Sequence, residues 1–221
     1  MIKAIIFDFD GTLADTLPEI HEGVNMTMRI LGHPEHSRES IKSFINNGAR
    51  QLIRRALPAA LQEDENTVDE ALKIFEKCYG EVYLHTEKTY NGVKELVQRL
   101  HKDYKIGVLS NKQDPFVKQL SAQVLAAGSY DAAQGVIPNH PTKPHAYLSE
   151  KIAADMGVAT GECILVGDSD IDFLTAQNAN MEHIGVTWGF RSEEFLREKG
   201  VTQIAHTPEE LETLIRGTIR L

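Results

Sequence analysis

The stretch Ile5-Ile6-Phe7-Asp8-Phe9-Asp10-Gly11-Thr12-Leu13 decides how this chain is interpreted. A short apolar run followed at once by two carboxylates predicts a buried strand that ends in acidic side chains. Gly11 and Thr12 allow the chain to turn sharply directly afterwards. Because ligands bind at the carboxyl ends of strands in a parallel α/β sheet, Asp8 and Asp10 are the first candidate site residues.

Beyond Tyr90 the sequence alternates between apolar runs of strand length and amphipathic stretches of helix length. The apolar runs at 106–109 and 163–166 both end in polar residues, as the first run does. Alternation of this kind predicts an α/β fold with a doubly wound, Rossmann-like parallel sheet and right-handed crossovers. We expect the second strand to end at Ser110 and Asn111.

Residues 17–88 have a different character, with helical periodicity and no convincing buried strand. Asn66 through Asp69 is expected to cap a long helix in this block. The pattern predicts a core domain of residues 1–15 and 90–221, with a helical domain of residues 16–89 inserted after the first strand.

Composition excludes several classes of protein. A formal net charge of -9 over 221 residues argues against a general binder of nucleic acid or anionic membranes. Cys78 and Cys163 are too few for a disulfide framework or a zinc cluster. We find no signal-peptide pattern and no apolar run near the roughly 20 residues of a membrane span, so we expect a cytoplasmic protein. The dinucleotide fingerprint and the Walker loop are absent, which disfavours nicotinamide enzymes and P-loop NTPases.

Polar side chains cluster where three predicted strands end. The clusters are Asp8 with Asp10, Ser110 with Asn111, and Asp168 with Asp172. Lys143 lies in a loop between the second and third clusters. If the strands are parallel neighbours, these groups converge at one edge of the sheet. Crowded carboxylates need a positive charge among them, and oxygen ligands of this kind suit Mg²⁺, while a lysine and a serine suit a phosphoryl group.

Four segments carry a resemblance to a known family. DFDGTLAD at 8–15, LSN at 109–111, Lys143-Pro144 and GDSDID at 167–172 resemble, in order and spacing, the four motifs of the haloacid dehalogenase-like phosphohydrolase superfamily. The helical block resembles the cap of the subgroup whose cap follows the first motif. Residues 47–49, 54–57 and 188–192 look most like those of phosphoglycolate phosphatases.

The resemblance implies a role for each acid. Asp8 would be the nucleophile that forms an aspartyl-phosphate, and Asp10 would be the general acid and then the general base. Mg²⁺ would be held by the Asp8 carboxylate, the Asp10 backbone carbonyl and Asp168, with Asp172 supporting them. Taken alone, Asp168 and Asp172 could equally be acids at a helix start, and Asp170 fits a helix cap.

The remaining candidates would contact the substrate. The resemblance implies that Ser110 hydrogen-bonds a phosphate oxygen and that Lys143 offsets charge on the phosphate and on Asp8. Thr12 is expected to orient Asp10, and Asn111 to lie beside the phosphoryl group. A cap that binds a small acid would want one cation for its carboxylate, and Arg50, after the turn at 47–48, is our choice.

These expectations lead to a Mg²⁺-dependent phosphatase for a small phosphorylated metabolite such as phosphoglycolate, in a monomer or homodimer. A phosphomutase of the β-phosphoglucomutase type would share the whole site and differ in its cap. A halide-releasing dehalogenase does not need the second acid that Asp10 supplies. A non-hydrolytic phospho-accepting regulatory module would also have an acidic α/β pocket, but it has no use for a large helical insertion.

Overall fold

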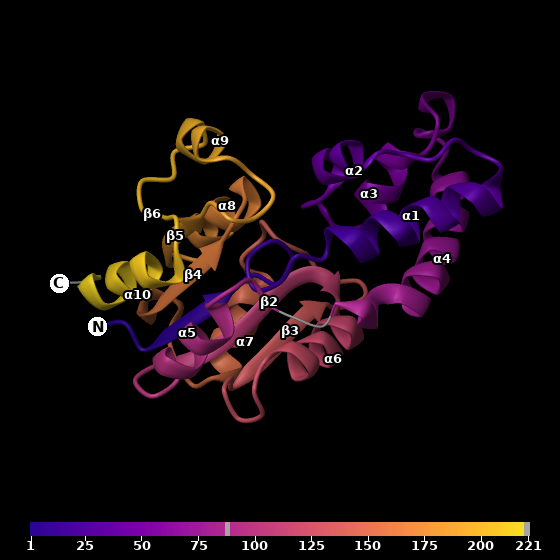
Figure 1. The fold of residues 1–221 in the computed structure, drawn as a ribbon. Coiled ribbons are helices and arrows are strands. Elements are labelled where there is room, and N and C mark those ends of the chain that lie inside the picture. Colours follow the sequence, from indigo (N-terminus) through magenta and orange to yellow (C-terminus); the bar gives the residue numbers. More distant parts are fainter. Residues whose placement is uncertain (87–88, 219–221) are drawn as a thin grey trace. The chain divides into compact units, whose positions relative to one another are not determined.

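A computed structural model describes residues 1–86 and 89–218. Its centre is a six-stranded sheet in the order β3-β2-β1-β4-β5-β6, and every strand pair is parallel (Figure 1). The strands are β1 (Ala4–Phe7), β2 (Lys105–Gln113), β3 (Ala132–Val136), β4 (Cys163–Gly167), β5 (Glu182–Val186) and β6 (Ile204–Ala205). This order reverses between β1 and β4, so the predicted doubly wound fold is confirmed.

The register brings the predicted strand ends to one level. Phe7, the last residue of β1, lies beside Val108 of β2 and Val166 of β4. The backbone N–H of Asp8 continues this pairing and donates to the Val166 carbonyl at 2.8 Å. Residues that follow β1 and β4 therefore leave the sheet at the same edge. Strands β1 and β4 are buried along their whole length, as expected of central strands covered on both faces.

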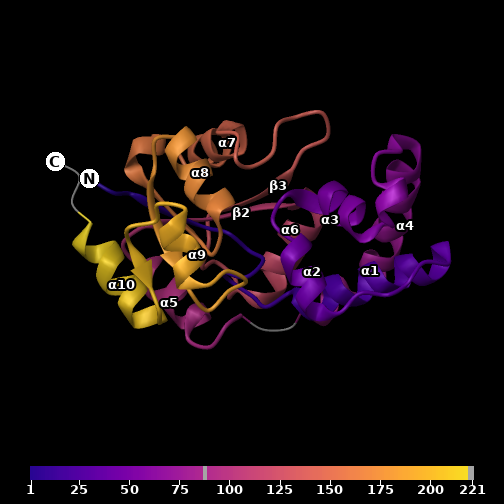
Figure 2. The ribbon, with the colours of Figure 1, turned by 90° about the horizontal axis from the view of Figure 1, so that it is seen from above.

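Helices cover both faces of the sheet. The helices of this unit are α5 (Val93–Leu100), α6 (Asp114–Val124), α7 (Tyr147–Asp155), α8 (Asp170–Asn178), α9 (Glu193–Glu198) and α10 (Pro208–Gly217), with a short η3 (Thr160–Glu162). Helices α7 and α8 lie on one face of the sheet (Figure 2). On that face Ile152 and Ala176 share a core with Ile6 and Leu165. Helices α5 and α10 pack together on the other face.

Between β1 and β2 the chain forms a separate, entirely helical unit. The described part of this unit covers residues 16–86, and residues 1–15 belong with 89–218 to the sheet-containing unit. Its elements are α1 (Leu17–Leu31), α2 (Arg38–Phe44), α3 (Gly48–Ala56), η1 (Ala59–Leu61), α4 (Glu65–Val82) and η2 (Tyr83–His85). Met28, Ile53 and Phe75 are among the buried side chains of its own core.

Three local expectations are wrong. Strand β2 does not end at Ser110 and Asn111, because a register shift after Leu109 lets it continue until Gln113 pairs with Val136 of β3. The cap of α4 is Asp64, whose carboxylate accepts from the backbone N–H groups of residues 66 and 67, and not a residue of 66–69.

The third concerns α8, whose cap is Ser169 and not Asp170. Ser169 has an extended backbone, and its hydroxyl accepts from the backbone N–H of Asp172. The Asp172 carboxylate in turn accepts from the Ser169 N–H, which completes a capping box.

Among residues 1–86 and 89–218, no helix combines the length and the apolar character that a membrane crossing requires.

Candidate active site

Three buried aspartates meet at the carboxyl edge of the sheet. Asp8 follows β1, Asp168 follows β4, and Asp172 lies in the first turn of α8. Each offers one carboxylate oxygen, and these oxygens lie within 4.8 Å of one another. These residues are far apart in the chain. They meet because β1 and β4 are parallel neighbours and α8 begins directly after β4.

Lys143 supplies a positive charge inside this cluster. Its Nζ lies 2.9 Å from Asp8 Oδ1 and 2.6 Å from Asp172 Oδ1, and its side chain is 3% exposed. Burial lowers the pKa of the ammonium, but the attraction of Asp172 and Asp8 outweighs burial and raises the pKa above its usual value. Lys143 therefore stays protonated at neutral pH.

The acids outnumber the cations. Burial raises the pKa of Asp8 well above its ordinary value, although Lys143 opposes the shift. Burial, reinforced by the charge of Asp172, raises the pKa of Asp168 to about 7. Such shifts mean that ionised carboxylates are poorly compensated by the protein alone. An oxygen donor set with excess negative charge in a buried place fits a hard divalent cation, so Asp8, Asp168 and Asp172 could hold Mg²⁺.

Asp168 is oriented from two sides. The backbone N–H of Phe190 donates to its Oδ2 at 2.6 Å, and the Thr12 hydroxyl donates to its Oδ1 at 3.2 Å. We expected Thr12 to orient Asp10, but its hydroxyl contacts the acid of the neighbouring strand. The Trp188 indole N–H donates to the Thr12 carbonyl at 3.0 Å. The loop after β5 and the turn after β1 therefore fix Asp168 jointly.

Glycine is required in the turn after β1. Gly11 has a φ of +87°, in the left-handed region, and a Cβ added there would lie 2.6 Å from Asp168 Oδ2. Any side chain at this position would displace the Asp168 carboxylate.

Asp10 contacts Ser110 and Lys112. Ser110 Oγ donates to Asp10 Oδ2 at 3.2 Å, and the backbone N–H of Lys112 donates to Ser110 Oγ at 3.1 Å. The Nζ of Lys112 lies 2.9 Å from Asp10 Oδ1. Lys112 was not among the sequence-based candidates, although it directly follows the LSN segment at 109–111. Its signal was its place at the end of a strand that already carried two site residues.

Asn111 holds the backbone of the Lys143 loop. Its side-chain amide donates to the Lys143 carbonyl at 3.0 Å, and its carbonyl oxygen accepts from the Lys143 N–H at 2.8 Å. These paired contacts position the residue that carries the buried ammonium. We expected Asn111 to lie beside the phosphoryl group, and that expectation stays a prediction.

Arg50 belongs to the helical unit. Its guanidinium donates to Asp69 and Glu65, and its side chain is 37% exposed. Within that unit, therefore, the arginine that we expected to bind a substrate carboxylate already has two acidic partners.

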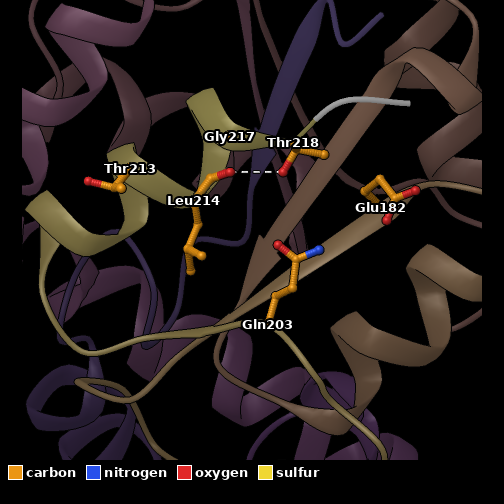
Figure 3. A pocket seen from close by; sticks show the side chains of 6 residues that line it. All are labelled: Glu182, Gln203, Thr213, Leu214, Gly217 and Thr218. Carbon is orange, nitrogen blue, oxygen red and sulfur yellow. Dashed lines mark hydrogen bonds between the residues drawn. The ribbon is translucent and has the colours of Figure 1, made fainter. Parts of the chain in front are cut away.

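A cavity of about 360 Å³ opens elsewhere in the sheet-containing unit. Its lining is Glu182, Gln203, Thr213, Leu214, Gly217 and Thr218 (Figure 3). Glu182 is the first residue of β5, so this cavity lies toward the amino end of the strand and away from the acidic cluster. Among residues 1–86 and 89–218, its lining holds one carboxylate and no cation.

Comparison with known proteins agrees with the geometry. The model of the haloacid dehalogenase-like hydrolase family matches residues 5–186. The phosphoglycolate phosphatase of Colwellia psychrerythraea is 27% identical over 214 residues, which cover 95% of each chain. That of Photobacterium profundum is 30% identical over 194 residues, covering 86% of this chain and 85% of the relative.

A crystal structure from Lactobacillus delbrueckii subsp. bulgaricus, of a protein provisionally named a phosphoglycolate phosphatase, superposes with a TM-score of 0.89. That protein is 31% identical, and the superposition covers 98% of this chain and 99% of the other. The family match spans most of the sequence, and the fold and the edge at which its acids meet agree with it. This chain therefore belongs to the haloacid dehalogenase-like hydrolases.

Proposed function

We propose that this protein is a Mg²⁺-dependent phosphatase that hydrolyses a small organic phosphomonoester, with phosphoglycolate as the best candidate substrate. The observation that carries the proposal is the contact of Lys143 with Asp8 inside the buried group of three aspartates. A carboxylate that is buried, paired with an ammonium and close to a cation site is suited to attack an anionic phosphorus centre. The resemblance to phosphoglycolate phosphatases supports the substrate.

Asp8 is the proposed nucleophile. Its carboxylate attacks phosphorus, the bond from phosphorus to the ester oxygen breaks, and an aspartyl-phosphate forms. The ester oxygen leaves with the electron pair and takes a proton from Asp10. Asp10 then removes a proton from water, the resulting hydroxide attacks phosphorus, and the bond to Asp8 breaks to release inorganic phosphate.

The other site residues balance the charge of the reacting groups and hold them in position. Lys143 offsets the charge of Asp8 and of the phosphoryl oxygens, and Ser110 Oγ donates to a phosphoryl oxygen. Asp8, Asp168 and the Asp10 backbone carbonyl would hold Mg²⁺, with Asp172 supporting them. When bound, the ion would neutralise the approaching anions and polarise the phosphoryl group.

The family resemblance supports one further part of the proposal, that the helical unit serves as a cap domain. Two parts come from the sequence alone: Arg50 is a candidate for contact with the leaving group, and the enzyme works in the cytoplasm as a monomer or homodimer.

Phosphate release from a panel of small phosphomonoesters, with Mg²⁺ and with a chelator, tests the proposal. We expect Mg²⁺-dependent release that Asp8→Asn abolishes. Asp170→Asn is the control, because Asp170 is an acid at the start of α8, near Asp168 and Asp172 in the sequence but outside the cluster. Full activity of Asp8→Asn, or activity that a chelator does not change, would contradict the proposal. Conversion of a hexose 1-phosphate to its 6-phosphate without phosphate release would indicate a mutase instead.

A further inference from the structure

We propose that Lys112 determines specificity by binding a carboxylate on the leaving group of the substrate. This inference rests on the proposed phosphatase function and names a residue that recognises the organic part of the substrate. The Lys112 side chain is 8% exposed, and its Nζ lies 2.9 Å from Asp10 Oδ1, beside the acid that would protonate the leaving oxygen.

The two lysines of the site contact different acids. Lys143 contacts Asp8 and Asp172, on the side where phosphorus is attacked. Lys112 contacts Asp10, on the side where the leaving group departs. The ammonium beside Asp10 is not required to hold the phosphoryl group, which already has Lys143 and Ser110. It can instead stabilise a negative charge on the organic part of the substrate.

The distances suit a short acid. A general acid works within about 2.6–3.2 Å of the oxygen that it protonates. With Asp10 Oδ1 as the oxygen that carries this proton, adding the 2.9 Å between Oδ1 and Lys112 Nζ places the ammonium within about 6 Å of the ester oxygen. A carboxylate one carbon away from that oxygen falls inside this reach. An ammonium has three N–H donors, so Lys112 can hold Asp10 and a substrate oxygen together.

Burial makes the Lys112 charge effective. Water screens the ion pairs of exposed side chains, and such pairs contribute little. Arg50, our sequence-based candidate for the same task, is 37% exposed and contacts Asp69 and Glu65. At 8% exposure, Lys112 is far less screened, so it discriminates more strongly between a charged and an uncharged leaving group.

The test compares two substrates of equal chain length. Phosphoglycolate carries the carboxylate, and 2-hydroxyethyl phosphate has a hydroxymethyl group in its place. We expect Lys112→Met to lower kcat/KM for phosphoglycolate by at least about thirtyfold, mainly through KM, because a buried charge pair loses one partner. For 2-hydroxyethyl phosphate we expect a loss of about threefold or less. This substrate loses no contact of its own, and Ser110 still donates to Asp10 when the Lys112–Asp10 pair is gone. Lys112→Arg keeps the charge and should keep the preference for phosphoglycolate.

Two more variants make the outcome decisive. Lys112→Gln can still donate to Asp10 but has no charge, so it should lose the preference even if Lys112→Met folds poorly. Lys118→Met removes an exposed lysine of α6 and should change nothing. An equal loss for both substrates, including complete inactivity toward both, would show that Lys112 only positions Asp10 and would overturn the proposal. A wild-type protein that cleaves 2-hydroxyethyl phosphate but not phosphoglycolate would also overturn it while leaving the phosphatase function standing. Wild-type protein that releases no phosphate from any ester would instead overturn the proposed function.

Discussion

The ammonium of Lys143 lies 2.9 Å from a carboxylate oxygen of Asp8, and the two side chains are only 3% and 9% exposed. Little water separates or screens these charges, so each strongly affects the other. Burial favours the protonated form of Asp8, and Lys143 is the strongest influence against it. The ionised state that a nucleophile needs therefore depends on this contact.

Replacement of Lys143 by Met should destabilise the protein as well as inactivate it. The change leaves Asp8 and Asp172 without their ammonium, and breaking a buried ion pair costs about 3–5 kcal/mol. Urea unfolding in the presence of a chelator measures the loss. We expect added Mg²⁺ to recover part of the stability, because a cation can offset the same carboxylates. A free energy of unfolding within about 0.5 kcal/mol of wild type would contradict the predicted coupling.

Mg²⁺ should raise the melting temperature through Asp168. A ligand that binds only the folded state stabilises it by about 2.7 kcal/mol at a concentration of 100 times its Kd. We expect the rise in melting temperature to grow with Mg²⁺ concentration in the wild type and in Asp170→Asn. In Asp168→Asn we expect no rise. Thermal unfolding over a Mg²⁺ titration measures it. An unchanged shift in Asp168→Asn would exclude this residue as a ligand.

Two glycines allow backbone strain to be separated from the effect on the site. Gly11 and Gly157 both have positive φ values, +87° and +73°, so alanine at either costs about 1–2 kcal/mol. Only at Gly11 would the new Cβ meet Asp168, since nothing lies within 4 Å of a Cβ at Gly157. We expect similar losses of stability from backbone strain in both variants, but a loss of phosphatase activity and of the Mg²⁺ shift only in Gly11→Ala. Equal activity of the two variants would argue against the importance of the Gly11 turn for Asp168.

His183 should make the fold sensitive to acid. It is buried in β5, neither ring nitrogen has a hydrogen-bond partner among the described residues, and burial lowers its pKa to about 4. The unfolded chain, with a histidine pKa near 6.5, binds more protons between pH 4 and 6.5, so His183 reduces stability as the pH falls through that range. Relative to wild type, the free energy of unfolding of His183→Leu should rise by about 1.6 kcal/mol as the pH falls from 6.5 to 5.

His206 provides a control of opposite sign. Hydrogen bonds that the His206 ring donates to Glu193 and Glu210 raise its pKa, so its contribution to stability is present below the unfolded pKa and disappears as the pH rises. His206→Gln should therefore lose stability at acid pH, where His183→Leu gains it. Urea unfolding at several pH values measures both. Parallel pH profiles for wild type and His183→Leu would contradict the account.

The fold and the meeting of the acids could be predicted because both depend on regular geometry. Strands of a parallel sheet end at a common edge, so Asp8 and Asp168 had to be close once β1 and β4 were neighbours. Side-chain contacts beyond the strand ends follow local irregularities that no periodicity reveals. The register shift after Leu109 lets β2 run on to Gln113, and Lys112, within that extension, reaches Asp10. Likewise, the turn at Gly11 decides that Thr12 reaches Asp168.

The central claim is that Asp8 accepts the phosphoryl group. The most direct measurement is rapid acid quenching of the wild-type enzyme during turnover of phosphoglycolate, followed by mass-spectrometric mapping of the phosphorylated peptide. The account predicts a phosphoryl group on Asp8 that is absent from Asp8→Asn. A phosphoryl group on Asp10 or on any other residue, or turnover of Asp8→Asn at the wild-type rate, would contradict it.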